Sequence, residues 1–367
     1  KVKSFKYISV VSIAALIGCQ NVSKVDSVAN KQNTVVSHYA DLAHTVYADS
    51  RLTAGKLQQA ISDLVENQSE ATLKLARDAW IDARIPYQQS EVFRFGNEIV
   101  DAWEGRLNAW PLDEGLIDYV DQGEYDYVMG NPGATANIIA NTSLQNGGQA
   151  YDLSSITPEL IAGLNEFGGS ESNVASGYHA IEFLLWGQDL NGTSIGAGKR
   201  QASDFMQDDR CTNGNCDRRV AYLQSAMSLL LSDLDYMVNQ WSDKGEYRKQ
   251  LLSESQYQVV RRMLFGMGSL SLGELAGERM KVALEANSPE DEHDCFSDNT
   301  HNSHYYNAKG IQNVYLGSYQ KVDGSKVEGP SISDLVQAIN PKSDSEIKNS
   351  MASTMQSMAT MVSRAES

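Results

Sequence analysis

Apolar residues recur every three or four positions over most of the chain, which is the spacing that one face of an α-helix produces. Alternation of apolar and polar positions, which marks β-strands, is scarce. Pro86 predicts a kink or a restart in the helical stretch around it. The pattern therefore predicts an all-α protein, with roughly four helices in each half, the number that closes a bundle around one core. Six stretches carry the helical spacing most clearly: 35–46, 57–64, 73–83, 220–238, 263–275 and 347–362.

Polar stretches divide this pattern into two four-helix-bundle-like domains. Residues 188–216 are rich in Gly, Asn and Asp and are typical of a crossing between domains. We therefore predict an N-terminal bundle at 34–190 and a C-terminal bundle at 191–367. Two irregular stretches, 105–155 and 287–330, contain many aromatic residues and little low-complexity sequence. We predict long ordered loops there, and loops of that length in compact proteins are usually functional or disordered.

The N-terminus has the pattern of an export signal. Three lysines within the first six residues precede a short apolar run at 8–17, which is too short to span a bilayer. The run ends in Leu16-Ile17-Gly18-Cys19, which resembles the lipobox of bacterial lipoproteins. We therefore expect a lipoprotein signal peptide at 1–18, acylation of Cys19 and a polar tether at 19–33. An ordinary signal peptide with an incidental cysteine is the alternative.

The charge balance limits the class of partner. The chain has 30 Lys and Arg against 47 Asp and Glu, a formal net charge of −17. Nucleic-acid binding derives its affinity from clusters of basic residues, so we expect no nucleic-acid partner. An acidic surface instead attracts cations.

Cysteine spacing suggests one local disulfide. Cys211 and Cys216 flank an Asn-Gly turn, which lets the two thiols meet, and disulfides persist in exported proteins. The alternative is half of a zinc site, which would need two more ligands. Cys295 is left over.

One predicted helix carries the clearest candidate chemistry. His179 and Glu182 are three residues apart, so on a helix they share a face and can reach the same cation. Their neighbours are apolar, so we predict that the pair is buried and needs polar partners. Trp186, at the end of this stretch, is a candidate for a supporting or ligand-binding role. The alternative is a histidine and a carboxylate that satisfy only each other inside a bundle.

A second acidic helix can supply further groups. Glu91 lies among apolar residues and is our candidate for a third metal ligand, while Arg84 and Arg94 are candidates for orienting carboxylates. The alternative is an Arg–Glu ion pair within the bundle. Glu274 and Glu278, one turn apart, either face the same site or pair with neighbouring basic residues.

The stretch at 290–301 is dense in side chains that bind metals or ligands. It contains His293 and Asp298, for which we predict a supporting or ligand-binding role. The alternative is a solvated acidic loop.

These blocks together resemble a known family. Gly177-x-His179-x-x-Glu182 resembles the GxHxxE motif of imelysin-like proteins, which are filed as peptidase family M75, and the blocks 90–97, 108–120, 211–219 and 292–306 resemble its iron-regulated protein A branch. The resemblance implies two helical bundles with the site near their junction, in a bacterial envelope protein tied to iron acquisition. It also implies that Gly177, His179 and Glu182 belong to the site and that Glu91 fits an acidic position of the first bundle.

Three functions remain open from the sequence. The first is an anchored binding protein for iron or an iron-containing ligand, working with envelope iron-uptake components; iron is the first choice of metal, and zinc and copper are alternatives. The second is an M75-type metallopeptidase, although the HExxH pattern of zinc peptidases is absent. The third is a non-catalytic interaction scaffold. Gln20, in place of Asp after Cys19, favours the outer over the inner membrane.

Overall fold

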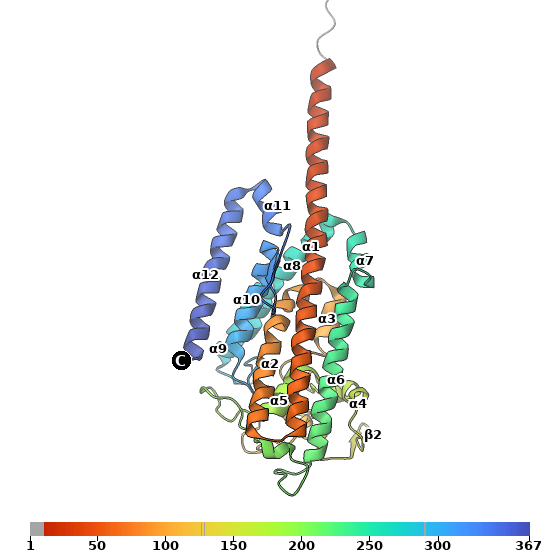
Figure 1. The fold of residues 1–367 in the computed structure, drawn as a ribbon, viewed down its shortest axis with the longest axis vertical. Coiled ribbons are helices and arrows are strands. Elements are labelled where there is room, and N and C mark those ends of the chain that lie inside the picture. The colour runs from red at the N-terminus through yellow and green to blue at the C-terminus, as the bar shows by residue number, and fades with distance from the viewer. Residues whose placement is uncertain (1–10, 126, 128, 290) are drawn as a thin grey trace, which may run out of the picture.

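The computed structural model is an assembly of helices around one long helix, α1 (Val11–Glu66). It describes the backbone of residues 11–125, 127, 129–289 and 291–367, and the side chains of these residues from position 31 onward. Figure 1 shows the long helices standing side by side in the order α12, α10, α2, α1 and α6. Their bounds are α2 (Glu70–Ser90), α6 (Cys216–Trp241), α10 (Thr300–Leu316) and α12 (Pro341–Ala365).

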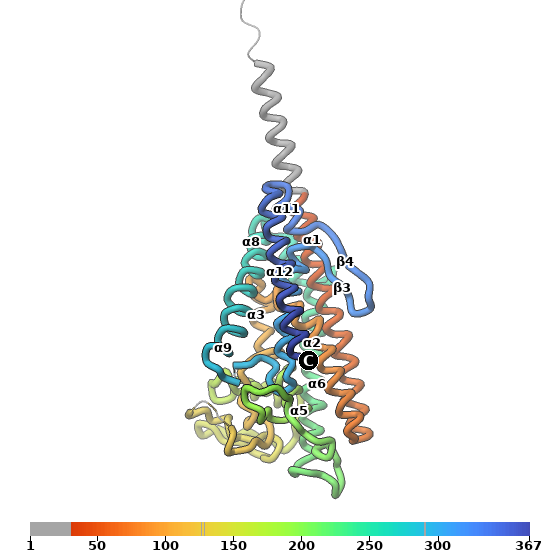
Figure 2. The backbone as a smooth tube through the Cα atoms, turned by 90° about the vertical axis from the view of Figure 1, so that its left-hand side faces the viewer, coloured from red at the N-terminus to blue at the C-terminus, as the bar shows by residue number. Residues whose placement is uncertain are grey.

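Short helices and 3₁₀ turns complete the fold. Loops and short elements from the middle of the chain gather around α5 at one end of the long helices (Figure 2). The short elements are η1 (Glu91–Phe93), α3 (Glu98–Glu104), η2 (Glu114–Leu116), α4 (Pro158–Leu164), η3 (Phe167–Gly169), α5 (Gly177–Trp186), η4 (Ala202–Phe205), α7 (Glu246–Ser253) and α11 (Ile332–Ile339).

The predicted N-terminal features fall mostly beyond what the structure describes. Residues 1–10 of the predicted signal peptide at 1–18 and the side chain of Cys19 lie outside the described residues. The segment 19–33, predicted to be a tether, belongs to the continuous helix α1. No helix in the described part of the chain is both long and apolar enough to cross a bilayer.

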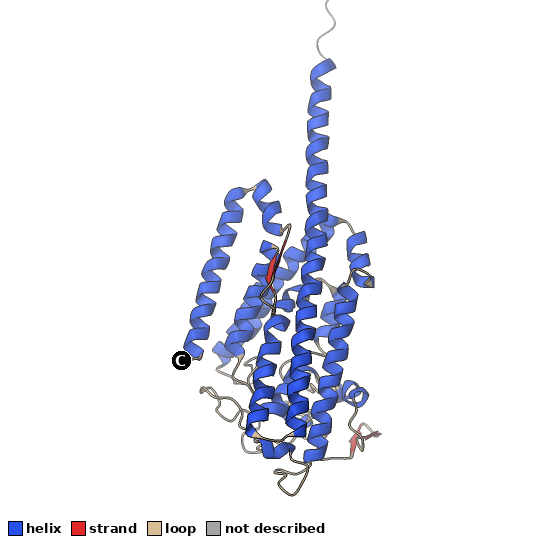
Figure 3. Ribbon diagram, viewed as in Figure 1, coloured by secondary structure: helices blue, strands red, loops and turns tan. Residues whose placement is uncertain are grey.

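The apolar stripes form the core, and the all-α prediction is confirmed. In α1 the stripe from Val35 to Leu64 is buried, and it packs against buried positions of α2 and α6 such as Trp80 and Leu230. Strands are confined to two antiparallel hairpins among the described residues (Figure 3), β1 (Ser143–Asn146) with β2 (Gln149–Asp152) and β3 (Ser318–Gln320) with β4 (Lys326–Glu328).

The main core continues across the predicted boundary at residue 190. Helix α6 of the predicted second domain packs against α1 and α5 of the first, and one apolar cluster extends from Val35 to Ile332. The division of the chain into two domains stays a prediction.

The stretch 287–330 is not the irregular loop that the sequence suggested, because α10 occupies its centre. The apolar spacing missed this helix because polar side chains interrupt its buried face, which alternates Asn307 and Asn313 with apolar residues such as Ile311 and Val314. Asn307 donates to the side-chain oxygen of Gln88 at 2.6 Å, and Asn313 contacts the side-chain oxygen of Gln89. These contacts dock α10 on α2, which itself continues through Pro86 without the predicted restart.

The helix after α7 changes its winding. Helix α8 (Gln256–Gly268) passes into a π-helical stretch, η5 (Ser269–Val282), and ends as α9 (Ala283–Ala286). In a π-helix, residues five apart are neighbours. Arg279 accordingly donates from Nε to Glu274 Oε1 at 3.0 Å, while Arg279 itself is 5% exposed.

Candidate metal centre

Helix α5 begins with a glycine that no other residue can replace without strain. Gly177 has φ of +84°, and a Cβ atom there would lie 2.4 Å from the carbonyl oxygen of Leu107. The next residue, Tyr178, donates its backbone N–H to the same carbonyl at 2.7 Å. The start of α5 is therefore locked against the chain at Leu107, and all ten of its residues are buried.

The predicted histidine–carboxylate pair meets on this helix. His179 Nδ1 lies 2.9 Å from Glu182 Oε2, and both side chains are completely buried. The second carboxylate oxygen of Glu182 accepts from the backbone N–H and the hydroxyl of Ser297, at 2.9 and 2.6 Å. Glu182 therefore joins α5 to the segment that precedes α10.

That segment brings in a carboxylate that the sequence analysis did not single out. Asp294 is fully buried and forms a paired contact with Arg84, from Nη2 to Oδ1 at 2.5 Å and from Nε to Oδ2 at 3.2 Å. Ser303 and Asn299 also donate to its Oδ2. Asp294 Oδ1 lies 3.7 Å from His179 Nδ1, so the carboxylate stands beside the α5 pair.

A second imidazole completes the group. The ring centroids of His179 and His293 are 4.7 Å apart, and the Trp110 ring lies 4.9 Å from that of His179. One ligand atom from each of His179, His293 and Asp294 can be chosen so that all three lie within 4.8 Å of one another, and all three residues are buried. His179 Nε2 has no hydrogen-bond partner among the described residues, and His293 Nδ1 makes no well-aligned hydrogen bond there, although Asp294 Oδ1 lies 3.4 Å from it.

The electrostatics keep both imidazoles neutral. Burial lowers the pKa of His179 well below its usual value, and the neighbouring His293 and Arg84 lower it further. Burial also lowers the pKa of His293, with Arg279 acting in the same direction. Neutral imidazoles offer a lone pair to a metal ion.

The pKa values of Glu182 and Asp294 are shifted in opposite directions. Burial, together with the charge of Asp294, raises the pKa of Glu182 well above its usual value. Burial would raise the pKa of Asp294 too, but Arg84 and His293 outweigh it and hold that pKa well below its usual value. Asp294 is therefore the ionised group of the cluster, and Arg84 balances its charge.

A pocket of about 400 Å³ leads to His293 from outside. Its wall includes Trp110 and Arg279. The acidic side chains that line it are Glu104, Glu166, Glu171, Glu274, Glu278 and Asp291. A route lined with carboxylates favours the entry of a cation over that of an anion.

Glu91, the predicted third ligand, is not part of the group formed by His179, His293 and Asp294. Glu91 is buried and accepts from Arg279 Nη2 at 2.6 Å, so the structure shows it in an ion pair and not with His179 and His293. Arg94 contacts Asp101 at 2.9 Å and Glu104 at 3.3 Å in the wall of the pocket. Arg84, in contrast, orients a carboxylate of the cluster itself.

The other predicted positions are spread around this centre. Trp186 ends α5 and packs edge-on against Trp80, away from the two imidazoles. Asp298 accepts from the backbone N–H of Gly196 at 2.9 Å and is not part of the three-residue group. Cys211 and Cys216 form a disulfide that ties the first residue of α6 to the preceding turn.

Comparison with known proteins supports the family resemblance. The chain is 22% identical to iron-regulated protein A of Synechococcus elongatus over 355 residues, covering 93% of this chain and 81% of the relative. Its fold matches the crystal structure of a protein assigned as an iron-regulated protein A precursor from Parabacteroides distasonis, with a TM-score of 0.63, 20% identity and coverage of 90% and 85% of the two chains. The sequence profile of the imelysin family, Peptidase_M75, matches residues 43–367, and the chain therefore belongs to the imelysin family.

Proposed function

We propose that this protein binds a metal ion, with iron as the first choice, through His179, His293 and Asp294, and that it serves iron handling at the bacterial envelope. One observation carries the proposal: two buried, neutral imidazoles stand beside an ionised carboxylate, with His179 Nε2 lacking any hydrogen-bond partner in the described structure and His293 Nδ1 facing Asp294 Oδ1 at 3.4 Å without a well-aligned hydrogen bond. Buried polar atoms without partners are rare and call for an explanation. The names of the two relatives support iron as the metal.

The donor set fits a transition metal. Two imidazoles and one carboxylate are a ligand set found at non-haem ferrous sites, and imidazole also suits zinc and copper. Three ligand atoms at about 2.1 Å from one ion lie about 3.0–3.6 Å from one another. The donor atoms here lie within 4.8 Å of one another, so the side chains have to close by up to about 2 Å to hold one ion.

Glu182 has a different role in this proposal from the one expected from the sequence. Its contact with His179 Nδ1 leaves Nε2 as the nitrogen without a partner. A carboxyl oxygen that accepts the Nδ1–H of the imidazole fixes the orientation of the ring and leaves the lone pair of Nε2 for a metal ion. Glu182 is thus a positioning residue, and Ser297 holds it in place.

The remaining parts of the function are proposed from the sequence. Acylation of Cys19 anchors the protein to the envelope, in the outer membrane in preference to the inner, and the acidic pocket guides a cation or an iron-containing ligand to His293. Hand-over to other iron-uptake components follows from that location.

Metal analysis of the purified protein tests the proposal. The metal-free protein is loaded anaerobically with ferrous iron, and separately with zinc and copper, then desalted and measured by plasma mass spectrometry. We expect one ion per chain in the wild type and loss of that ion in His179→Ala and in His293→Ala. The matched control is His304→Ala, because His304 is also buried and its Nε2 also lacks a described partner, but it lies outside the three-residue group.

Two results would contradict the proposal. The first is a wild-type protein that retains no metal after loading, and the second is equal loss in the control and in the two site variants. Hydrolysis of an unfolded protein substrate that is abolished by chelator and by Glu182→Gln would instead support the metallopeptidase alternative.

A further inference from the structure

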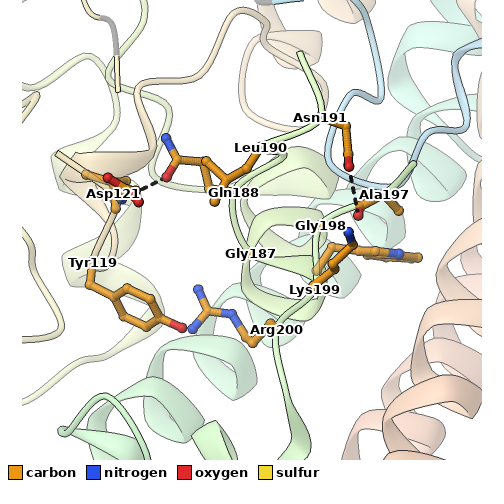
Figure 4. A pocket seen from close by; sticks show the side chains of 12 residues that line it. Tyr119, Asp121, Gly187, Gln188, Leu190, Asn191, Ala197, Gly198, Lys199 and Arg200 are labelled. Atoms are coloured by element: carbon orange, nitrogen blue, oxygen red, sulfur yellow. Dashed lines mark hydrogen bonds between the residues drawn. The ribbon is translucent and has the colours of Figure 1, made fainter. Parts of the chain in front are cut away.

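A second pocket lies at the other end of α5 from the start of that helix. Figure 4 shows it where the segments 119–121, 186–191 and 197–200 meet, and its volume is about 480 Å³. Pockets of this size suit small organic molecules. None of the groups of the metal cluster lines it.

Arg200 in the wall of this pocket has an unused hydrogen-bonding edge. The residue is 5% exposed, and its Nη1 contacts Asp118 at 2.8 Å and Asp204 at 3.0 Å. Its Nε and Nη2 have no hydrogen-bond partner in the described part of the chain. A buried donor left unpaired costs free energy, and a charged donor costs more than a neutral one.

The guanidinium of Arg200 is held in one orientation. Its backbone N–H donates to the carbonyl of Trp186 at 2.8 Å, and its backbone carbonyl accepts from Arg77 at 2.7 Å. The guanidinium carbon lies 4.9 Å from the ring centroid of Tyr119 and 5.5 Å from that of Phe183. Its unused edge is therefore preorganised for a ligand, which lowers the entropy cost of binding.

The chemistry of that edge selects the ligand. The N–H groups of Nε and Nη2 are parallel and match the two oxygens of a carboxylate, forming a paired, charge-assisted contact. Lys199, which is exposed, adds a second positive charge to the lining, while Asp121 adds one negative charge. Asp118 and Asp204 balance the charge of Arg200 from one side only, so its unused edge still offers positively polarised N–H groups to the pocket.

The rest of the lining suits a carbon skeleton. Trp186, Tyr119 and Leu190 present apolar surface, and Leu190 is 56% exposed. We propose that this pocket binds a small organic carboxylate, with the carboxylate on the Nε/Nη2 edge of Arg200 and the carbon skeleton against these three residues. This binding is independent of the metal proposed at the other site.

Calorimetric titration with benzoate tests the pocket. Benzoate combines a carboxylate with a flat apolar ring, while benzamide has the same shape without the charge, and inorganic phosphate supplies an anion without a carbon skeleton. We expect saturable binding of benzoate in preference to both. Arg200→Lys keeps the positive charge but removes the paired edge, so its affinity for benzoate falls about tenfold or more.

Three further variants make the outcome decisive. Arg210→Lys is the matched control, because Arg210 is exposed, pairs with Asp208 and does not line the pocket. His179→Ala separates this pocket from the metal centre and should bind benzoate like the wild type. Gln188→Glu keeps the acceptor that takes the backbone N–H of Asp121 at 2.8 Å but adds a negative charge to the lining, so it weakens benzoate binding even if Arg200→Lys fails to fold.

Several results would overturn the inference. The first is that benzoate does not bind at concentrations up to about 10 mM, which correspond to a very weak complex. The second is that benzamide binds as well as benzoate, and the third is that only phosphate binds. Unchanged affinity in Arg200→Lys or Gln188→Glu, once circular dichroism shows that the variant is folded, would overturn it equally.

Discussion

Replacing Asp294 with Asn should cost this protein much of its stability, in the absence of any metal. The substitution keeps the shape of the side chain and removes its charge. Arg84 is 1% exposed and has Asp294 as its only ion-pair partner in the described structure, so its guanidinium would remain buried without a counter-charge. The amide of Asn would also place donors where Arg84, Asn299 and Ser303 already donate.

The magnitude follows from how completely the pair is buried. Removing one partner of a buried ion pair costs about 3–5 kcal/mol, because the other charge is left uncompensated. Part of that cost is offset, since Arg84 Nη1 still donates to Asn108 at 2.6 Å and the guanidinium lies 5.1 Å from the Tyr178 ring. We therefore expect Asp294→Asn to lower the free energy of unfolding by about 3 kcal/mol, the lower end of that range.

Chemical unfolding at pH 7 with chelator present measures this loss. The matched control is Asp78→Asn, which breaks the exposed ion pair with Lys74 and should cost about 0–1 kcal/mol. The double variant Arg84→Met with Asp294→Asn removes the stranded charge and should recover part of the stability. If Asp294→Asn unfolds within about 1 kcal/mol of the wild type, the ion pair does not have the role described here.

Three further outcomes follow from the structure. Burial raises the pKa of Glu104 from 4.5 to about 7, so its contribution to stability is fully present below pH 4.5 and is lost as the pH rises through 7. Glu104→Gln should therefore be more stable than the wild type at pH 8, by at most about 3 kcal/mol. Chemical unfolding at pH 8 and at pH 4 measures this difference, and we expect no gain at pH 4. Gly177→Ala should lower the thermal unfolding temperature because its Cβ would lie 2.4 Å from the Leu107 carbonyl, whereas Gly163→Ala in α4, with nothing within 4 Å, should leave it unchanged or raise it. Replacing Cys211 and Cys216 with serine should cost about 2 kcal/mol, since the disulfide closes only a short loop, and equal stability of this variant and the wild type in chemical unfolding would contradict that estimate.

The helices whose buried face is apolar were predictable from the sequence. The stripe from Val220 to Val238 lies in α6, and the stripe from Leu73 to Ala83 lies in α2. Burial of apolar side chains stabilises the fold, so the apolar positions in the sequence mark the buried faces of these helices. Helix α10 was not predictable in this way, since it docks on α2 through amides such as Asn307 and Asn313. The buried face of α10 mixes these amides with Ile311 and Val314, so its apolar pattern is short and interrupted.

In the candidate site, too, local spacing predicted some residues and not others. His179 and Glu182 are three residues apart, so helical geometry alone predicts that they meet. Asp294 follows them by more than a hundred positions, and no local spacing joins it to α5. The one local signal was its place beside His293, in a stretch dense in ligand-type side chains; its backbone, with φ of +62°, turns sharply there. Such long-range pairing is set by tertiary packing.

The burial of His179, His293 and Asp294 bears on whether these residues serve the proposed metal binding or only stabilise the core. A protein that needed only a satisfied core could have left two apolar side chains at positions 179 and 293, since unpartnered polar atoms cost free energy and apolar replacements do not. Here the one ionised group, Asp294, is neutralised by Arg84, while His179 Nε2 has no partner in the described structure and His293 Nδ1 lies 3.4 Å from Asp294 Oδ1. Under the proposed function, a divalent cation entering this group would meet three donors whose own charges are already balanced, so its charge would be held chiefly by lone pairs and by the acidic wall of the pocket that leads to His293.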